Sequence, residues 1–360
     1  IFIFKNLSVG KLVMKIIVDG IIEKLQDNGG CTVYFSQLLN FLQNTQGVEI
    51  DFLKYASIDR GIKLQTGNSH IYGTVSRLME RWRDVKVDES LLSAKSIFHS
   101  THYRLPTKKH GLKTVTTVHD FTYELYRSGP PQWMHSWQKF RAIRNSDLVI
   151  CVSQNTAADL MKYCPIDKEK IRVVYNGVSD VYRPLDLRSI SNEVVFIGAR
   201  GWYKNFTLAV ETLSNLPDLT LAIVGGGALS KDECELLETK LPGRFKWYGR
   251  LDDSSLNELY NRAHCLFYPS SYEGFGIPVA ESMRAGCPVI AVAVSSIPEV
   301  AGDAAILVDS ASVENFVSAF HKLQDPALRA SIIEKGFKQS SKFSWYECYK
   351  ATLAVYEELI

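Results

Sequence analysis

The segment "SSYEGFGIPVAESMRAGCPVIA", Ser270 to Ala291, contains a glycine-containing turn, a proline and two glutamates, Glu273 and Glu281. Pro278 suits the first position of a helix, because the N–H that proline lacks would have no partner there. The segment therefore predicts a turn over residues 273–277 that leads into a helix. The amides of such a turn and the partial positive charge of a helix N-terminus together bind phosphate oxygens.

The two glutamates are separated by seven residues, one before the turn and one within the helix. A carboxylate that faced phosphates would repel them, so each glutamate is expected to face hydroxyl groups. One can accept hydrogen bonds from a sugar and the other from a ribose, which outlines a nucleotide-sugar site. The alternative is that Glu273 only caps the helix and Glu281 lies on the surface.

The rest of the chain alternates short Val- and Ile-rich runs with amphipathic stretches, the pattern of parallel sheets built from strand-helix-strand units. We expect two open α/β sheets in series. The expected strands are residues 15–18, 49–53, 96–99, 113–118 and 148–152 in the first half, and 193–197, 219–224, 245–248, 265–268, 288–291 and 305–308 in the second.

A length of 360 residues suits two domains. The polar, turn-rich stretch over residues 175–192 places the boundary near Arg183, which gives domains at 14–183 and 184–343 and a last helix within 344–360. That helix is expected over residues 345–359, with Ser344 as its cap and Glu347 reaching back to complete a capping box. Residues 1–13 are interpreted as an upstream extension.

Composition limits the classes of function. No run of eighteen apolar residues is present, and the seven cysteines never form a C-x-x-C pair. A cytoplasmic protein without a spanning helix or a zinc site is expected. Residues 1–185 hold 25 Lys and Arg against 17 Asp and Glu, a net charge of +8, whereas residues 186–360 hold 16 against 22, a net charge of −6. No motif indicates a nucleic-acid partner.

Further charged and glycine-containing segments lie at expected strand ends. "FIGARGWYKNFTLAVE" places Arg200 and Lys204 in a loop before a helix, where cations can neutralise a diphosphate. The Gly29-Gly30 pair precedes a helix in the first domain, and its amides can face the cleft. His119 and Asp120 follow another strand, where ligand-facing residues of open α/β sheets collect. Each of these segments also has a purely structural interpretation, as solvated surface, a turn or a hydrogen-bonding pair.

These motifs resemble one known family. "EGFGIPVAE", preceded by "FYPSSY" and followed by "AGCPVIA", together with "GARGWYKN" and "VVYNGV", is similar to the family-4 (group 1) retaining glycosyltransferases of the GT-B fold. The resemblance implies two Rossmann-like doubly wound domains that face each other across a cleft, with a C-terminal helix that crosses back to the N-terminal domain. The N-terminal domain would bind the acceptor and the C-terminal domain the nucleotide sugar.

The resemblance also implies an activity and a set of site residues. The activity is metal-independent transfer of a hexose, with mannose as the suggested sugar, from a nucleoside-diphosphate sugar to a glycan or glycolipid, as in polysaccharide or lipopolysaccharide biosynthesis, with no cofactor besides this co-substrate. The absence of a D-x-D signature agrees with basic residues and amides in place of a metal. The implied catalytic residues are His119, Arg200, Lys204 and Glu273, and the implied donor-binding residues are Gly29, Gly30, Arg250, Leu251, Gly274, Phe275, Gly276, Ile277 and Glu281.

One spacing departs from the family pattern. Many members have four residues between the arginine and the lysine, whereas three separate Arg200 and Lys204, as in a "YKN" subgroup. Two alternatives stay open. An epimerase or a nucleotide-sugar-binding protein of the same fold would keep Arg200 and Glu281 without acceptor-dependent turnover. An NAD-dependent oxidoreductase is suggested by Gly225-Gly226-Gly227, although Ser230 occupies the place of the third glycine of G-x-G-x-x-G.

Two basic, tryptophan-containing segments, 77–86 and 130–144, suggest contact with a membrane surface. In the second, Trp133, Trp137 and Phe140 share one helical stripe. Such a stripe either contacts an anionic membrane, which would bring a lipid-linked acceptor within reach at the inner face, or forms the buried face of a core helix.

Overall fold

The computed structural model describes residues 14–26, 29–55, 67–72, 82–93, 95–107, 111–186 and 189–360, without the side chain of Trp202. The expected upstream extension, residues 1–13, and residues 77–81 of the first tryptophan-containing segment lie outside this description. Among the described residues, no helix is both long and apolar enough to span a membrane.

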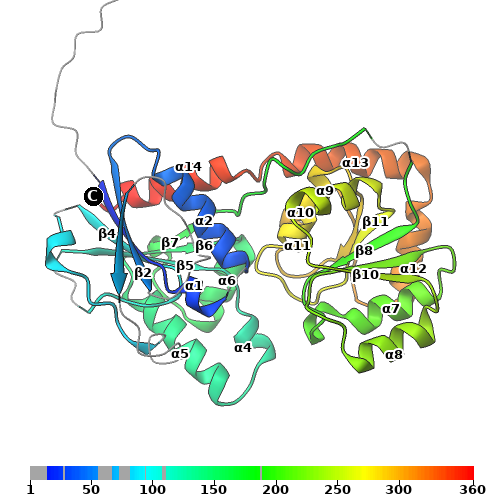
Figure 1. Cartoon of the computed structure of the whole chain (residues 1–360), viewed down its shortest axis with the longest axis horizontal. Coiled ribbons are helices and arrows are strands. Elements are labelled where there is room, and N and C mark those ends of the chain that lie inside the picture. The colour runs from blue at the N-terminus through cyan, green and yellow to red at the C-terminus, as the bar shows by residue number, and fades with distance from the viewer. Residues whose placement is uncertain are drawn as a thin grey trace, which may run out of the picture.

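Two parallel sheets, each covered by helices on both faces, lie side by side (Figure 1). Within the described residues the first sheet has seven strands in the order β3-β2-β1-β4-β5-β6-β7, with every neighbouring pair parallel. Its strands are β1 (Met14–Asp19), β2 (Val48–Tyr55), β3 (Asn68–Tyr72), β4 (Ser96–Ser100), β5 (Lys113–Val118), β6 (Leu148–Cys151) and β7 (Ile171–Val173). Its helices are α1 (Ile22–Leu25), α2 (Gly30–Leu42), α4 (Thr122–Tyr126), α5 (Pro130–Asn145) and α6 (Gln154–Tyr163).

The second sheet has six strands among the described residues, in the order β10-β9-β8-β11-β12-β13, again all parallel. Its strands are β8 (Glu193–Ile197), β9 (Thr220–Val224), β10 (Phe245–Gly249), β11 (Cys265–Tyr268), β12 (Val289–Val292) and β13 (Ile306–Val308). Its helices are α7 (Phe206–Ser214), α8 (Lys231–Lys240), α9 (Asp253–Arg262), α10 (Ile277–Arg284), α11 (Ile297–Ala301), α12 (Val313–Leu323) and α13 (Pro326–Ser340). Both sheets thus reverse strand order beside their first strand, the topology of a Rossmann-like domain.

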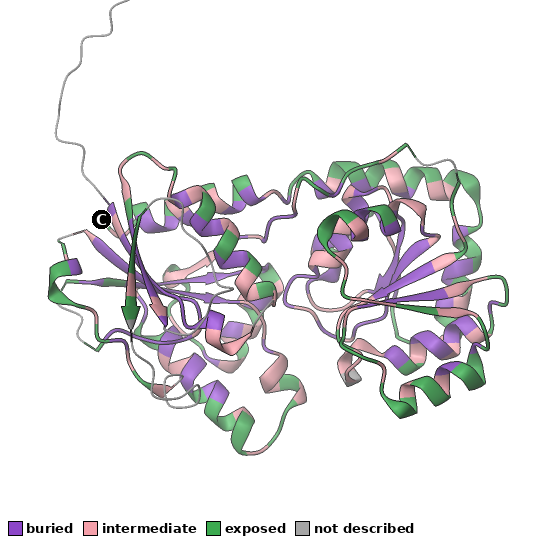
Figure 2. Ribbon diagram, viewed as in Figure 1, coloured by how far each residue is buried: buried purple, intermediate pink, exposed green. Residues whose placement is uncertain are grey.

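The expected strands are all present, with ends that agree with the expected ranges to within two residues. The central strands are buried on both faces (Figure 2), which explains why they read as apolar runs in the sequence. Two strands, β3 and β7, were not expected. Both lie at the edges of the first sheet, and the short, mixed sequences "NSHIY" and "IRV" give no apolar run.

The last helix, α14 (Trp345–Glu357), runs from the second domain back across the first (Figure 1). Ser344 caps it by accepting a hydrogen bond from the Glu347 amide at 3.1 Å, but the Glu347 carboxylate contacts Lys350 instead of completing the expected capping box. The helix packs against α2. Its Tyr356 hydroxyl hydrogen-bonds the buried His99 of β4 at 2.6 Å, so the C-terminal segment is part of the N-terminal core.

Candidate active site between the two domains

A cavity of about 730 Å³ lies between the two sheets at the carboxyl ends of their strands. This is the end of an open α/β sheet where ligands bind, and the volume suits a ligand of nucleotide size. The N-terminal domain contributes Gly29 and Gly30 at the start of α2, and α14 contributes Trp345. The C-terminal domain contributes Gly225, Gly226, Gly227, Ala228, Trp247, Gly249, Arg250, Asp253, Ile277, Pro278 and Glu281, among others.

The opening segment of the sequence forms one wall of this cavity. It leaves β11, turns over residues 269–276 and enters α10 at Ile277. Pro278 occupies the second helical position, one residue later than expected. Gly276 precedes the helix with a φ of +92°, which glycine adopts without the strain that a side chain would cause. The N-terminus of α10 therefore faces the cavity with Ile277 and Pro278, whereas Gly274, Phe275 and Gly276 do not line it, and phosphate binding by this turn stays a prediction.

Glu281 lies one turn into α10, half-buried in the cavity wall. Burial raises the pKa of Glu281 to about 8, and the nearby charge of Asp253 acts in the same direction, against the effect of the Tyr182 side chain. The Tyr182 hydroxyl donates its proton to Asp253 at 3.1 Å. The Glu281 carboxyl is therefore largely protonated at pH 7 in the free protein.

Rising pH is expected to destabilise the free protein through Glu281. The folded pKa of about 8 lies above the ordinary 4.5, so between these values the folded state keeps a proton that the unfolded state releases. The free energy of unfolding should fall as pH rises through this window and be lowest above pH 8. Glu281→Gln cannot ionise and should lose this part of the dependence. Thermal unfolding of both proteins across the window tests it, and parallel pH curves would contradict the raised pKa.

Lys204 and Glu273 meet at the end of β11. The Lys204 ammonium donates to Glu273 Oε1 at 2.5 Å and to the Tyr268 hydroxyl at 3.1 Å. Both charged side chains are nearly buried, at 11% and 13% exposed, and such a pair needs good geometry to offset the cost of removing charge from water. The structure thus brings two of the predicted catalytic residues into direct contact.

Arg200 points into a neighbouring loop. Its guanidinium donates to the Glu233 carboxylate at 2.8 Å, and to the Gly225, Gly227 and Ala228 carbonyls at 2.7 to 3.2 Å. Gly225, Gly226 and Gly227 all have φ values between +73° and +77°, the left-handed conformation that glycine adopts readily. Arg200 therefore shapes the loop that forms a cavity wall, and its predicted contact with a diphosphate stays a prediction.

Gly274 is where the two domains approach most closely in the EGFG turn. A Cβ atom at Gly274 would lie 1.8 Å from the His119 carbonyl oxygen and 3.0 Å from the Asp120 Cβ. The Gly274 carbonyl accepts hydrogen bonds from the side chains of Ser153 at 2.6 Å and Thr156 at 3.0 Å. The backbone of the turn is thus held directly against the His119-Asp120 segment.

His119 lines a second cavity, of about 250 Å³, on the other side of this contact. His102, Tyr103 and His135 line it from the same domain, and Tyr203 from the C-terminal domain. The His119 Nε2 atom is buried and has no hydrogen-bond partner in the described structure. Burial lowers the pKa of His119 to about 4, against the opposing effect of Asp120, so the ring is neutral at pH 7.

The comparisons with known proteins identify the family of both domains. A family model described as "Glycosyltransferase Family 4" matches residues 28–181, and one described as "Glycosyl transferases group 1" matches residues 183–339. The chain belongs to the group 1 glycosyltransferases. Over 288 residues it is 27% identical to O-antigen chain mannosyltransferase B of Escherichia coli, a match that covers 73% of this chain and 74% of that protein.

Solved structures share the GT-B fold of this glycosyltransferase. Sucrose-phosphate synthase of Thermosynechococcus elongatus superposes with a TM-score of 0.75 at 19% identity, covering 96% of this chain and 99% of that one. Anabaena HepE in complex with UDP and glucose gives a TM-score of 0.72 at 14% identity, with 96% and 100% covered. The expected fold class and family are therefore confirmed.

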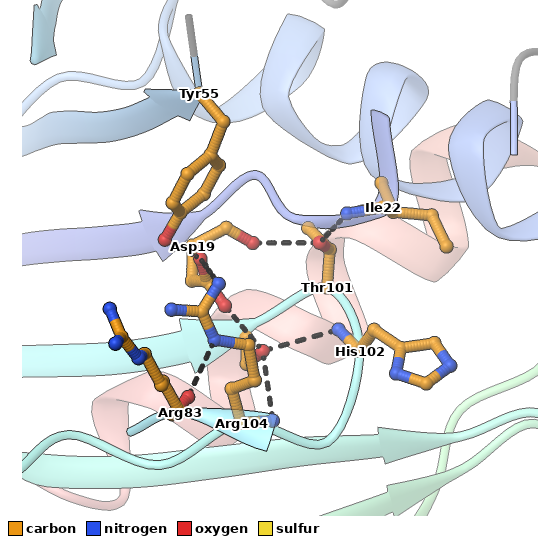
Figure 3. A network of polar contacts seen from close by, with 8 residues as sticks. Asp19, Ile22, Tyr55, Arg83, Thr101, His102 and Arg104 are labelled. Carbon is orange, nitrogen blue, oxygen red and sulfur yellow. Dashed lines mark hydrogen bonds and ion pairs between the residues drawn. The ribbon is translucent and has the colours of Figure 1, made fainter. Parts of the chain in front are cut away.

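A buried polar network holds one wall of the smaller cavity of the glycosyltransferase (Figure 3). Asp19, at the end of β1, accepts hydrogen bonds from the Tyr55 hydroxyl at 2.6 Å and the Ser100 hydroxyl at 2.9 Å, and lies 3.6 Å from the Arg104 guanidinium. Its carbonyl accepts from the Thr101 hydroxyl at 2.7 Å. These contacts fix the loop over residues 101–104, in which Tyr103 has an unusual φ of +48°.

The remaining predicted residues are placed as follows. Arg250 lines the larger cavity and is exposed, whereas Leu251 packs against the core of the C-terminal domain. The Phe275 ring is buried against Tyr175 and Phe343, so only its amide is left for a ligand. Gly29 and Gly30 are the N-cap and first residue of α2 and line the larger cavity.

Sequence reasoning missed residues that join the domains. Glu299 of α11 accepts hydrogen bonds from the Gln154 and Asn155 amides, both at 3.0 Å, and so caps α6 of the other domain. Tyr272 accepts from the Phe121 amide at 2.9 Å and donates to Asp159 at 2.8 Å. Asp253, which contributes to the raised pKa of Glu281, was also missed. Its position after a strand end was the one available signal.

Proposed function

We propose that this glycosyltransferase moves a hexose from a nucleoside-diphosphate sugar to a glycan or lipid-linked acceptor, with retention of anomeric configuration and without a metal ion. The observation that carries the proposal is the 730 Å³ cavity in which the N-terminus of α10, Glu281 and Arg250 face Gly29 and Gly30 across the domain junction. The nucleoside diphosphate would occupy this cavity, with Glu281 at the ribose. HepE, of similar fold, has been solved with UDP and glucose.

The sugar would lie near the Lys204-Glu273 pair and His119. As the bond between the anomeric carbon and the diphosphate oxygen breaks, negative charge develops on the leaving group and positive charge on the sugar ring. Lys204 and the amides at the α10 N-terminus would stabilise the leaving group. Glu273 would accept hydrogen bonds from sugar hydroxyls, and the neutral His119, which lines the smaller cavity, would lie beside the sugar.

Retention follows if the acceptor oxygen attacks from the face that the diphosphate leaves. In that scheme the new bond forms between the acceptor oxygen and the anomeric carbon, and the acceptor proton passes to the departing phosphate oxygen. No protein nucleophile is needed, which agrees with the ion pairing of Glu273 to Lys204. The smaller cavity beside His119 would hold the acceptor group that attacks.

Mannose is the favoured sugar, because the relative of 27% identity is an O-antigen chain mannosyltransferase. The same likeness favours polysaccharide or lipopolysaccharide assembly in the cytoplasm, with the acceptor held at the inner face of the membrane. The excess of basic residues in the N-terminal half, a net charge of +8, supports peripheral contact with anionic lipid.

A thermal-shift panel in buffer with EDTA tests the donor site. UDP, GDP, ADP, dTDP and NAD are added separately to the purified protein. One nucleoside diphosphate is expected to stabilise it by about 2.7 kcal/mol at a hundredfold excess over its dissociation constant, and the same shift should be absent in Arg250→Ala/Glu281→Ala. Stabilisation by NAD alone would contradict the proposal and point to Gly225–Gly227. Binding without acceptor-dependent turnover would favour a nucleotide-sugar-binding protein.

A further inference from the structure

Helix α5 exposes apolar side chains and buries polar ones, the reverse of an ordinary amphipathic helix. Trp133 and Trp137 are 67% and 56% exposed, and Met134 is exposed beside them. The buried side of the helix is instead largely polar, with His135, Ser136, Gln138 and Lys139 next to Ala142 and Ile143. The alternative that Trp133 and Trp137 form the buried face of a core helix is therefore wrong, and only Phe140 of that stripe is partly buried.

The polar side of α5 is occupied by the active-site region. The fully buried Lys139 ammonium donates to the Glu124 carboxylate at 2.7 Å and to the Asp120 carbonyl at 2.9 Å. Ser136 donates to the same carboxylate at 2.7 Å, and His135 lines the cavity beside His119. This accounts for the polar interior but not for two largely exposed tryptophans, of which Trp137 has its ring 6.4 Å from that of Trp82.

The exposed side forms one continuous stripe. Its members follow helical spacings of three and four, so they share one face of the helix. They are Pro130, Trp133, Met134, Trp137, Arg141 and Arg144. The helix contains no Asp or Glu. Arg141 is paired with Asp84 at 2.6 Å and lies over the Trp137 ring at 5.7 Å, while Arg144 is exposed.

We propose that this face of α5, which we call the tryptophan face, docks the enzyme on an anionic lipid surface. The inference rests on the proposed function, in which the acceptor is lipid-linked, and it assigns the contact to particular residues. Tryptophan rings favour the boundary between headgroups and acyl chains, and arginines bind lipid phosphates. An exposed face of aromatic and thioether side chains, flanked by Arg144 and by the Arg141–Asp84 ion pair, matches that surface.

Charge distinguishes a lipid surface from a second copy of this chain. A twofold contact between two tryptophan faces would bring Arg144 of one copy toward Arg144 of the other, in domains that already carry excess positive charge. Anionic headgroups attract the same groups. The opposite side of the helix reaches the cavity beside His119, so docking would leave about 10 Å, one helix diameter, between lipid and site.

Vesicle flotation with the full chain tests the proposal. The protein is mixed with vesicles of phosphatidylcholine alone or with added phosphatidylglycerol, and no sugar donor is present. Wild-type protein should float with the anionic vesicles, and less so at high salt. Trp133→Ser/Trp137→Ser should reduce the floated fraction by about tenfold, because the interfacial rings supply the apolar part of the binding. Arg144→Glu should reduce the floated fraction with the anionic vesicles but not with vesicles of phosphatidylcholine alone.

The matched control is Tyr346→Ser. Tyr346 is an aromatic residue of α14 and is 54% exposed. Helix α14 lies on the other side of the N-terminal sheet from α5 (Figure 1). This variant should float as the wild type does. Thermal unfolding midpoints close to the wild-type value would show that the variants fold, since exposed substitutions change stability little.

Three results would overturn the assignment. The first is equal flotation of the double tryptophan variant and Tyr346→Ser, and the second is no flotation of the wild type. The third is a dimer of the wild type in sedimentation that the double variant loses, which would make the face a contact between copies. None of these results contradicts the transferase proposal, because stabilisation by a nucleoside diphosphate is measured without vesicles. Conversely, flotation would stand if no nucleoside diphosphate bound.

Discussion

Lys204→Ala is expected to lower kcat/KM for sugar transfer by about 10²- to 10³-fold, the usual effect of removing one group that stabilises developing charge. Lys204 is the cation that the structure holds beside Glu273, at the end of β11 and close to the turn that leads into α10. The loss should fall mainly on kcat, because charge on the diphosphate grows as the bond to the sugar breaks. Steady-state kinetics with the donor identified by thermal shift measures it.

Three further variants make the result specific. Lys338→Ala removes an exposed lysine paired with Glu334 and should leave kinetics unchanged. Lys204→Arg should recover part of the rate. Glu273→Gln, alone and combined with Lys204→Ala, completes a double-mutant cycle, and two residues in direct contact should lose less together than the sum of the single losses. Additive effects would mean that the ion pair does not act as one unit. If Lys204→Ala turned over at nearly the rate of Lys338→Ala, Lys204 would have no role in catalysis.

Much of the fold was predictable because burial leaves a strong pattern. The central strands of both sheets are enclosed by helices, so their sequences are apolar throughout and bounded by turns. The edge strands β3 and β7 have a neighbour on one side only, and their sequences therefore carry polar residues and no period. The cap of α14 was predicted correctly at Ser344, whereas Glu347 took a local lysine as its partner.

Site residues could be predicted from the sequence only where they lie together in one continuous segment. The turn and helix around Glu273 and Glu281 are local in sequence, and the cavity wall at Ile277 and Glu281 followed from them. The contacts that Arg200 makes depend on the conformation of a loop 25 residues away, and no sequence pattern shows which carbonyls a guanidinium will meet. The sequence also could not show that α5 exposes its tryptophans and buries its polar side chains. Periodicity identifies which residues share a face of a helix, but not whether that face is buried or exposed.

Gly274→Ala is expected to reduce turnover at least about 100-fold, since displacements near 1 Å at a reacting centre have effects of that size. The added Cβ would stand 1.8 Å from the His119 carbonyl oxygen, and backbone atoms on both sides must move to relieve the clash. Movement would separate His119 from Glu273 and disturb the bonds from Ser153 and Thr156 to the Gly274 carbonyl. The thermal unfolding midpoint should fall as well.

The control for this change is Gly201→Ala, because a Cβ there would meet no described atom within 4 Å and the backbone conformation suits alanine. It should keep near wild-type kinetics. Nucleoside-diphosphate stabilisation should largely survive in Gly274→Ala, since most of the larger cavity lies in the C-terminal domain, away from the clash. Loss of turnover with retained donor binding would show that the junction at Gly274 aligns the two halves of the site. Equal rates for Gly274→Ala and Gly201→Ala would instead mean that the domains work without this contact, and that His119 acts from a different arrangement.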